Sequence, residues 1–151
     1  MRHLRAAAVH VLVLLGAGGC AGTAANEPAA AEPARAQQLW LGGRPDDYRF
    51  VWQQRCFCLP EATQPIRVTV TGETITAATD LHGAAVSEDV QSGLKSIDAL
   101  YAYALAQQRN GAEVRVTSDD RGVPAEVFVD PDPRVADDEL RVTVSAFEAL
   151  P

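Results

Sequence analysis

The sequence predicts an α+β domain in which an antiparallel sheet of about five to six strands carries one helix packed on one face. Three observations lead to this prediction. Aromatic and β-branched residues recur at every second position in several short segments, which is typical of half-buried strands. Short glycine-containing turns join these segments, which favours antiparallel hairpins. One stretch with helical spacing separates the strands into two groups, in the order β-β-β-α-β-β-β.

The first group of strands is expected after Tyr48, where aromatic residues alternate with outward-facing residues as far as Trp52. Residues 66–71 alternate in the same way, and residues 74–76 continue in a β-branched run. Two residues with glycine first separate these last two segments, and such a connection suits a tight hairpin. Residues 80–93 lack regular apolar spacing and are expected to form a loop.

The helix is expected over residues 96–109, with Ser96 as its N-cap and Asp98 in its first turn. Asn110 and Gly111 tolerate the left-handed conformation and end it. Its apolar stripe recurs at intervals of three and four residues, at Ile97, Leu100, Tyr101, Ala104 and Leu105.

The second group of strands is expected at residues 114–116, 127–129 and 140–145. The segment 130–139 between the last two is rich in acidic residues and proline. It is interpreted as a solvated loop, because its carboxylates do not have the spacing of a calcium-binding EF-hand.

The N-terminus resembles a bacterial lipoprotein signal peptide. Residues 1–19 combine a short basic start, an apolar run and small residues that lead directly into Cys20. The run is too short for the roughly 20 residues that span a bilayer. We therefore expect cleavage before Cys20 and attachment of lipid to its thiol. Ala21 and Gly22 stand where an aspartate would retain an inner-membrane lipoprotein, which implies an outer membrane address, facing the periplasm, in a Gram-negative host.

An ordinary secretory signal, cut near residues 23–25, is the alternative, and it would give a soluble secreted or periplasmic protein. The lipoprotein interpretation leaves Cys56 and Cys58 as an even pair, whereas the alternative leaves an odd thiol in an oxidising compartment. Residues 20–36 are rich in alanine, proline and glutamate and predict a flexible tether. Residues 37–151 are then expected to form a single domain.

The charge balance bears on possible partners. Removal of residues 1–19 leaves 11 Lys and Arg against 20 Asp and Glu, a net charge of −9. Nucleic acid is a poor partner for such a domain, because affinity for phosphate requires cations. Adsorption to anionic lipid is disfavoured for the same reason, so the lipid on Cys20 is the expected link to the membrane.

Cys56 and Cys58 form the sharpest chemical feature. Residues two apart on an extended segment point the same way, with Cα atoms near the upper end of the range that a disulfide spans. A structural disulfide is the first interpretation. A redox-active dithiol is the second, although the commoner redox spacing has two residues between the cysteines. A metal site is the third, in which His82 would be a further ligand.

No catalytic constellation is visible in the sequence. His82 is the single histidine after residue 19 and lies in the loop expected at residues 80–93. It would have to serve any Ser–His or Cys–His mechanism, and no G-x-S-x-G motif accompanies it. No phosphate-binding glycine loop or dinucleotide fingerprint is present, so no cofactor is expected.

Three blocks of residues, taken in order, resemble the DUF6174 family of bacterial envelope and secreted proteins of unknown function. The resemblance implies a fold and a cellular address but no activity, and it includes two cysteines that Cys56 and Cys58 match. The blocks are Cys56-Phe-Cys-Leu-Pro60 followed by residues 66–70, Ser96-Ile-Asp-Ala-Leu-Tyr101, and Gly122-Val-Pro124 followed by residues 127–130 and 137–139.

The function expected from these observations is that of a non-enzymatic, lipid-anchored envelope module that binds an unknown envelope protein or component. The alternative is a lipoprotein that uses Cys56 and Cys58 for thiol redox chemistry or for handling a soft metal.

Overall fold

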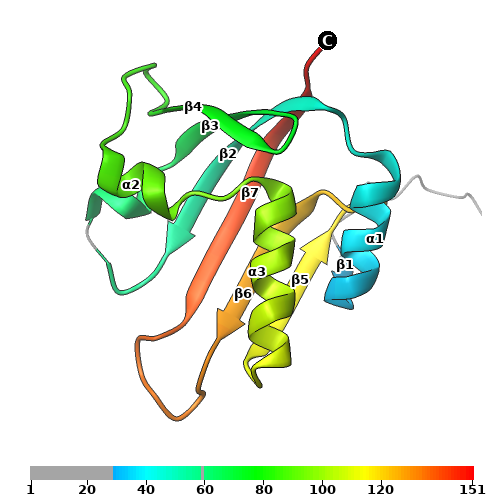
Figure 1. Ribbon diagram of the computed structural model, residues 1–151. Helices are drawn as coiled ribbons and strands as arrows, with labels where there is room; N and C mark the ends of the chain where they lie inside the picture. The colour runs from blue at the N-terminus through cyan, green and yellow to red at the C-terminus, as the bar shows by residue number, and fades with distance from the viewer. Residues whose placement is uncertain (1–28, 59) are drawn as a thin grey trace, which may run out of the picture.

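The computed structural model describes residues 29–58 and 60–151, and these form one antiparallel sheet with helices against it (Figure 1). The sheet has seven strands in the order β1-β5-β6-β7-β2-β3-β4, so β7 returns to the centre beside β2. The elements are β1 (Ala29–Ala31), α1 (Pro33–Gly43), β2 (Asp47–Arg55), the 3₁₀ turn η1 (Pro60–Thr63), β3 (Ile66–Thr71), β4 (Thr74–Thr79), α2 (Glu88–Gly93), α3 (Ile97–Arg109), β5 (Glu113–Ser118), β6 (Pro124–Asp130) and β7 (Leu140–Ala149).

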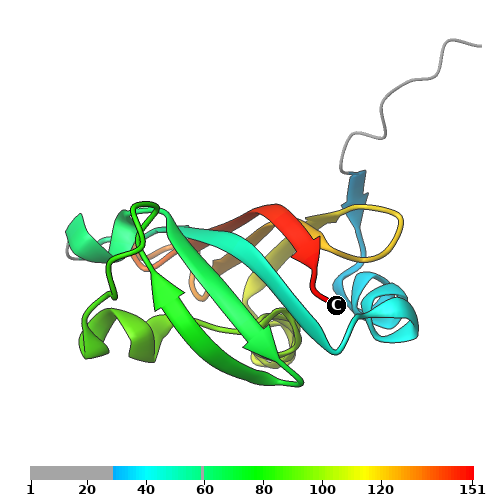
Figure 2. The same cartoon turned by 90° about the horizontal axis from the view of Figure 1, so that it is seen from above.

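Helices α1, α2 and α3 lie on one side of the sheet (Figure 2). The core is built between α1, α3 and the inward-facing side chains of the strands, which alternate with outward ones as the period of two requires. On β2 these inward residues are Tyr48, Phe50 and Trp52, each no more than 1% exposed. The remaining large core residues are Trp40, Ile66, Val68, Val70, Ile97, Leu100, Tyr101, Val116 and Val127.

The predicted α+β class and the antiparallel sheet are confirmed. The helix expected over residues 96–109 is also present, with the Ser96 hydroxyl accepting a hydrogen bond from the Ala99 amide at 3.3 Å. The prediction of a single helix is wrong, because α1 packs beside α3 on the same face. The expected number of strands is one short, since β1 pairs with β5 in addition to the six strands that alternation indicates.

The predicted tether over residues 20–36 is wrong at its C-terminal end, and the domain begins before residue 37. Helix α1 starts at Pro33 with Glu32 as its N-cap, and the Glu32 carboxylate accepts a hydrogen bond from the Arg35 amide at 3.0 Å. Only Pro33, Ala36 and Trp40 are buried, so the stripe is too short to be recognised from periodicity. Residues 1–28, with the expected signal peptide and Cys20, lie outside the described part of the chain.

The loop expected over residues 80–93 contains the short helix α2, with Ser87 as its N-cap. No residue of α2 is buried, so it has no apolar stripe that the sequence could reveal. Residues 80–86 fold back against the edge strand, where Thr79 pairs with Ala85 and the Val86 amide donates to the Ala78 carbonyl at 3.3 Å.

Helix α1 is held by a close contact with the turn between β5 and β6. Gly122 in that turn has φ +78°, and a Cβ atom there would lie 2.3 Å from the Trp40 amide nitrogen. The Tyr101 hydroxyl of α3 donates to the Gly122 carbonyl at 2.7 Å. The turn therefore contacts both helices. In the described residues, no helix is long and apolar enough to cross a membrane.

Candidate functional site: the open face of the sheet

The face of the sheet turned away from the helices is the candidate site, and we call it the open face. It is formed by the outward residues of the strands, on the side opposite α1, α2 and α3 (Figure 2). Antiparallel sheets commonly expose one polar face to water, so exposure alone does not indicate a site. The distribution of charge and two hollows distinguish this face.

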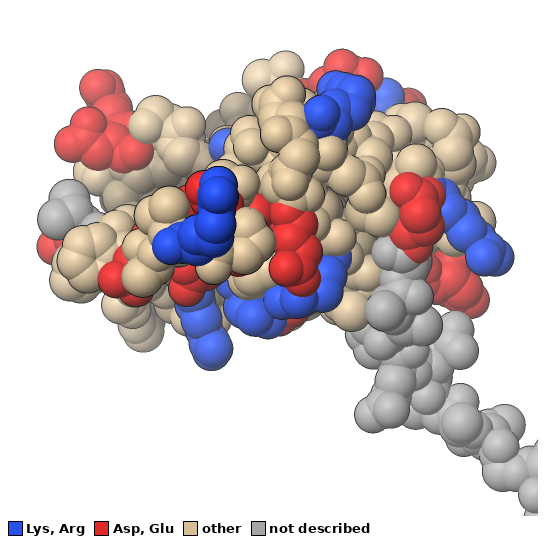
Figure 3. All heavy atoms as spheres, turned by 90° about the horizontal axis from the view of Figure 1, so that it is seen from below, with Lys and Arg blue, Asp and Glu red and all other residues tan. Residues whose placement is uncertain are grey.

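Arginines are concentrated on the open face of an otherwise acidic domain. Three of them are paired: Arg49 with Glu148 at 2.7 Å, Arg141 with Glu126 at 2.5 Å, and Arg115 with Glu113. Two others, Arg55 and Arg67, have no ion-pair partner among the described residues. Figure 3 views the molecule from below relative to Figure 1, and on that side acidic and basic side chains are interspersed.

Phe128 is a large apolar side chain on this face, outside the core cluster beneath the helices. Its ring lies between two guanidinium groups, with Cζ of Arg115 at 4.1 Å and Cζ of Arg141 at 5.1 Å from the ring centroid. Such contacts are attractive because the ring face is electronegative. They leave Phe128 only 8% exposed on a face without a helix over it in the described chain.

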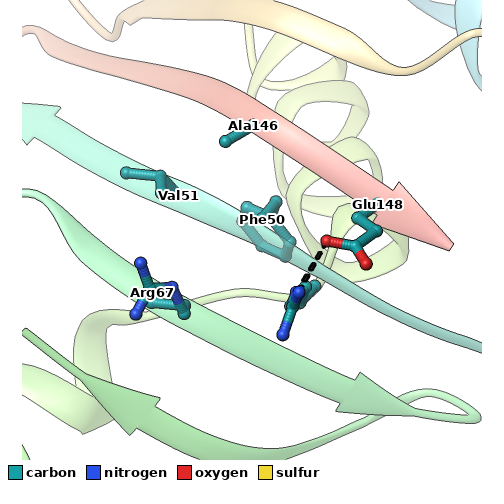
Figure 4. A pocket seen from close by; sticks show the side chains of 6 residues that line it. Phe50, Val51, Arg67, Ala146 and Glu148 are labelled. Atoms are coloured by element: carbon teal, nitrogen blue, oxygen red, sulfur yellow. Dashed lines mark hydrogen bonds and ion pairs between the residues drawn. The ribbon is translucent and has the colours of Figure 1, made fainter. Parts of the chain in front are cut away.

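The first hollow, which we call the bulge hollow, has a volume of about 390 Å³. Figure 4 shows Arg67 on β3 at one side, Glu148 on β7 at the other, and Val51 on β2 between the two strands. Alternation places the side chains of β2 and β3 outward, and the pairing of Val51 with Arg67 and of Arg49 with Glu148 brings the lining residues together. The lining residues are Arg49, Phe50, Val51, Arg67, Ala146 and Glu148.

A β-bulge shapes this hollow. The register between β2 and β7 shifts between Arg49 and Val51, and Ala146 on β7 adopts φ 49°. A left-handed conformation is unfavourable for alanine, because its Cβ approaches the following carbonyl, and it costs about 1–2 kcal/mol. Bulges of this kind are frequent beside functional sites, where they redirect a side chain. Here the bulge gives Glu148 an outward position and Phe147 an inward one, beside Trp40 and Tyr48.

The two arginines of the bulge hollow differ in whether they form an ion pair: Arg49 does and Arg67 does not, within the described residues. Glu148 uses a single carboxylate oxygen, Oε2, to accept from Arg49 Nε at 2.9 Å and from Nη2 at 2.7 Å. This pair is about half exposed, so water screens it and its contribution to stability is small. The exposed Arg67 guanidinium retains donors that no carboxylate of the described chain satisfies.

The second hollow, which we call the cysteine hollow, has a volume of about 350 Å³ and lies at the other end of β2. Phe57, at its edge, is 87% exposed, which is unusual for a side chain of this size. The lining residues are Arg55, Cys56, Phe57, Phe128, Asp137, Glu139 and Arg141.

Cys56 and Cys58 form a disulfide, which confirms the expected pair. The expected extended geometry is wrong: residues 56–58 bend after the end of β2, so the Cα atoms are 5.3 Å apart rather than near the upper end of the range that a disulfide spans. The Cys58 amide also donates to the Cys56 carbonyl at 2.9 Å. Together these bonds close a tight turn that holds Phe57 outward. Cys58 is exposed and Cys56 is half-buried, so the bridge lies at the surface.

His82 lies in a turn that is held by hydrogen bonds between residues close together in the chain. Its backbone amide and that of Ala84 both donate to Asp80 Oδ1, at 2.8 and 2.9 Å. The bond from the Ala84 amide is the largest cause that lowers the pKa of the Asp80 carboxyl. Within residues 29–58 and 60–151, no group of three or more His, Cys, Asp and Glu side chains could hold a metal ion. The structure therefore does not bring Cys56, Cys58 and His82 together as ligands.

The acidic loop between β6 and β7 contains an ion pair between residues close together in the chain, Asp132 and Arg134. Asp132 accepts from the Arg134 side chain at 2.9 Å, and this bond is the main cause of its lowered pKa. Desolvation raises the pKa of Asp130, and the neighbouring Asp138 charge raises it further. The loop forms one side of the cysteine hollow through Asp137 and Glu139.

The residues of the bulge hollow are absent from the sites that the sequence indicated. Alternation does place Arg49 and Arg67 outward, whereas Glu148 faces outward only because of the bulge at Ala146, since the alternation of residues 140–145 continues with position 148 inward. However, Arg49 and Glu148 are 99 positions apart in the chain, and only the pairing of β2 with β7 brings them into contact. No local signal specifies which two strands become neighbours.

These features define a one-domain α+β protein with an open antiparallel sheet. The model of DUF6174, a family of unknown function, matches residues 32–149, and the chain belongs to this family. This finding confirms the resemblance seen in the sequence, and the match begins at the N-cap of α1. No curated protein and no solved structure matches the chain.

Proposed function

We propose that this protein is a binding module of the bacterial cell envelope, anchored by lipid on Cys20 and without catalytic activity of its own. The open face of the sheet is its binding surface. The partner is an envelope protein or component that lies across β7, β2 and β3. The net charge of the chain after residue 19 disfavours nucleic acid as that partner.

The observation that carries this proposal is the contrast between the two faces of one sheet. One face is covered by α1 and α3 over an apolar core. The other carries Arg55 and Arg67 without ion-pair partners in the described chain, together with two hollows. Charged groups that a fold leaves unpaired on a shaped surface are available to a partner, and complementary charges provide specificity.

The anchoring part of the proposal rests on the lipoprotein-type signal that ends at Cys20. Intact mass of protein extracted from membranes tests it directly. The expected result is a mature chain that begins at Cys20 and carries lipid. A Cys20→Ala chain that fractionates with the membrane to the same extent as the parent would contradict the anchor.

Site-specific photo-crosslinking in cells tests the binding surface. A benzoylphenylalanine is placed at Val51 or Thr143 on the open face and, as matched controls, at Ala102 or Gln108 on the exposed side of α3. We expect one discrete adduct from the open-face positions and none from the controls. Equal adducts from both sets, or no adduct from either, would refute the open face as the binding surface. Turnover of a defined envelope substrate would refute the non-enzymatic assignment.

A second candidate function is thiol–disulfide exchange at Cys56 and Cys58. The surface position of the bridge favours it, because exchange requires access to a sulfur. Equilibration of the purified protein with glutathione buffers distinguishes the two functions. A structural bridge is expected to have a potential below about −300 mV, whereas a potential near that of the envelope redox enzymes would favour exchange.

A further inference from the structure

We propose that the bulge hollow binds a carboxylate group of a peptide, with the Arg67 guanidinium as the principal contact and Arg49 as the second cation. This inference rests on the proposed function, because it assigns a ligand class to part of the open face. The ligand carboxylate would lie above Val51, between β3 and β7 (Figure 4).

The first argument is the availability of Arg67. It is exposed, it lines the hollow, and none of the ion pairs of the described chain includes it. Guanidinium groups present a planar fork of donors that matches a planar carboxylate bidentately. The neighbouring strand supplies Arg49, whose position is held by Glu148 at 2.7 Å.

The second argument is the shape of the site. The bulge at Ala146 moves the outward residues of β7 out of register with β2, so Ser145 pairs with Val51 whereas Glu148 pairs with Arg49. Small side chains, Ala146 and Val51, therefore lie between the longer Arg67 and Glu148. The hollow of about 390 Å³ is large enough for a side chain or a chain terminus but not for a folded element.

The third argument favours a carboxylate over a phosphate. Glu148 lines the same hollow, and its Oε1 accepts no hydrogen bond within the described residues. This negative charge repels a dianionic phosphate more strongly than a monoanionic carboxylate. The net charge of −9 after residue 19 acts in the same direction. Glu148 is thus a residue that determines ligand specificity.

Titration by NMR tests the proposal on the chain from residue 20 onward, with Cys20→Ser in place of the lipid site. The probes are acetyl-trialanine with a free C-terminal carboxylate, acetyl-Ala-Glu-Ala-amide with a side-chain carboxylate, acetyl-trialanine-amide without charge, and inorganic phosphate, all at one ionic strength. We expect shifts of the backbone amides of Val51, Arg67 and Ala146 with one or both carboxylate peptides. The expected dissociation constant is on the order of 1 mM.

The two carboxylate peptides distinguish a chain terminus from an acidic side chain as the ligand. Arg67→Gln is expected to weaken binding about tenfold, because a charge-assisted bidentate contact is lost. Arg55→Gln removes another unpaired arginine from the open face, outside the hollow, and is expected to change affinity less than about twofold. Glu148→Gln is expected to narrow the preference for carboxylate over phosphate.

Three results would overturn the inference: no binding of either carboxylate peptide, equal loss with Arg55→Gln and Arg67→Gln, or a preference of the parent chain for phosphate. Each leaves the proposed function standing if the open-face crosslinks persist. Conversely, peptide binding without open-face crosslinks would refute the proposed function and retain the carboxylate site. Amide spectra of each variant show whether its fold is kept.

Discussion

Gly122 packs directly against the backbone of α1, and the geometry leaves no space for a side chain there. A Cβ atom would lie 2.3 Å from the Trp40 amide nitrogen and 2.4 Å from the Ala36 carbonyl oxygen, and the backbone has φ +78°. Both the conformation and the contact therefore require glycine. The neighbouring Tyr101 hydroxyl, at 2.7 Å from the Gly122 carbonyl, fixes the same turn from α3.

We predict that Gly122→Ala lowers the free energy of unfolding by more than about 2 kcal/mol, because left-handed strain and an overlap with α1 add together. Gly111→Ala is the matched control. Gly111 also has positive φ, +95°, but a Cβ there would meet nothing within 4 Å, so only the strain of about 1 kcal/mol is expected. Guanidinium unfolding measures both. Equal losses of unfolding free energy from the two variants would show that a side chain at position 122 does not disturb the contact with α1.

The disulfide closes a loop of only three residues, and so small a loop removes little entropy from the unfolded chain. We predict that Cys56→Ser with Cys58→Ser lowers the free energy of unfolding by less than about 2 kcal/mol. Truncation of a core residue, Trp52→Ala, should cost about 3–5 kcal/mol. Denaturant unfolding compares the two. A larger loss from the cysteine variant would mean that the bridge stabilises the fold as a whole.

At the scale of elements, α1 is the part of the domain that local patterns identify least. It contributes Ala36 and Trp40 to the core, both no more than 1% exposed. Trp40 contacts Tyr48 and Phe147 edge-to-face, with ring centroids 5.3 and 5.8 Å apart, which joins α1 to β2 and β7. An element with this many contacts belongs to the core rather than to a tether.

We predict that a chain beginning at Glu32 unfolds cooperatively. A chain beginning at Arg44 is expected to have a free energy of unfolding lower by at least about 3 kcal/mol, because Trp40 is removed from the core. Circular dichroism during denaturant unfolding measures both chains. The chain beginning at Glu32 also lacks β1, so its free energy of unfolding shows separately whether that edge strand is needed. Equal stability of the two chains would show that α1 is part of the tether and does not stabilise the domain.

At the scale of the whole molecule, buried tyrosine hydroxyls link α3 to β2 and to the turn between β5 and β6, and they make stability depend on pH. Burial is the largest cause that raises the pKa of Tyr48 and of Tyr101 above the ordinary value. The Tyr48 hydroxyl accepts from the Ile97 amide at 3.2 Å, and the Tyr101 hydroxyl donates to Gly122. Both hydroxyls are therefore protonated in the folded state when tyrosines of an unfolded chain begin to ionise.

We predict that stability falls as pH rises above about 10. There the unfolded chain releases protons that the folded chain retains, so the free energy of unfolding declines by up to about 1.4 kcal/mol per pH unit for each tyrosine. Below pH 10 the contribution is complete and constant. Unfolding measured between pH 8 and 11 gives the slope. Tyr48→Phe with Tyr101→Phe should flatten it, and an unchanged slope would assign the effect to other groups.

The sequence by itself determined the parts that rest on local chemistry. Alternation from Tyr48 to Trp52 and over residues 66–71 specified strands and their inward faces, since side chains on a strand point to opposite sides in turn. Ser96 and the apolar stripe of α3 specified a helix. Two cysteines separated by one residue predicted the bridge as the first of three interpretations, because their side chains lie within the distance that a disulfide spans.

Only the tertiary structure decided the position of β7 between β6 and β2, the docking of α1 and the existence of the bulge hollow. Strand order depends on contacts between residues about 90 positions apart, such as Thr143 with Gln53, and local periodicity carries no information about them. Helix α1 buries too few residues for a visible stripe, and α2 buries none. The hollow exists because a register shift places Arg67 and Glu148 on either side of small residues, and register is a property of paired strands.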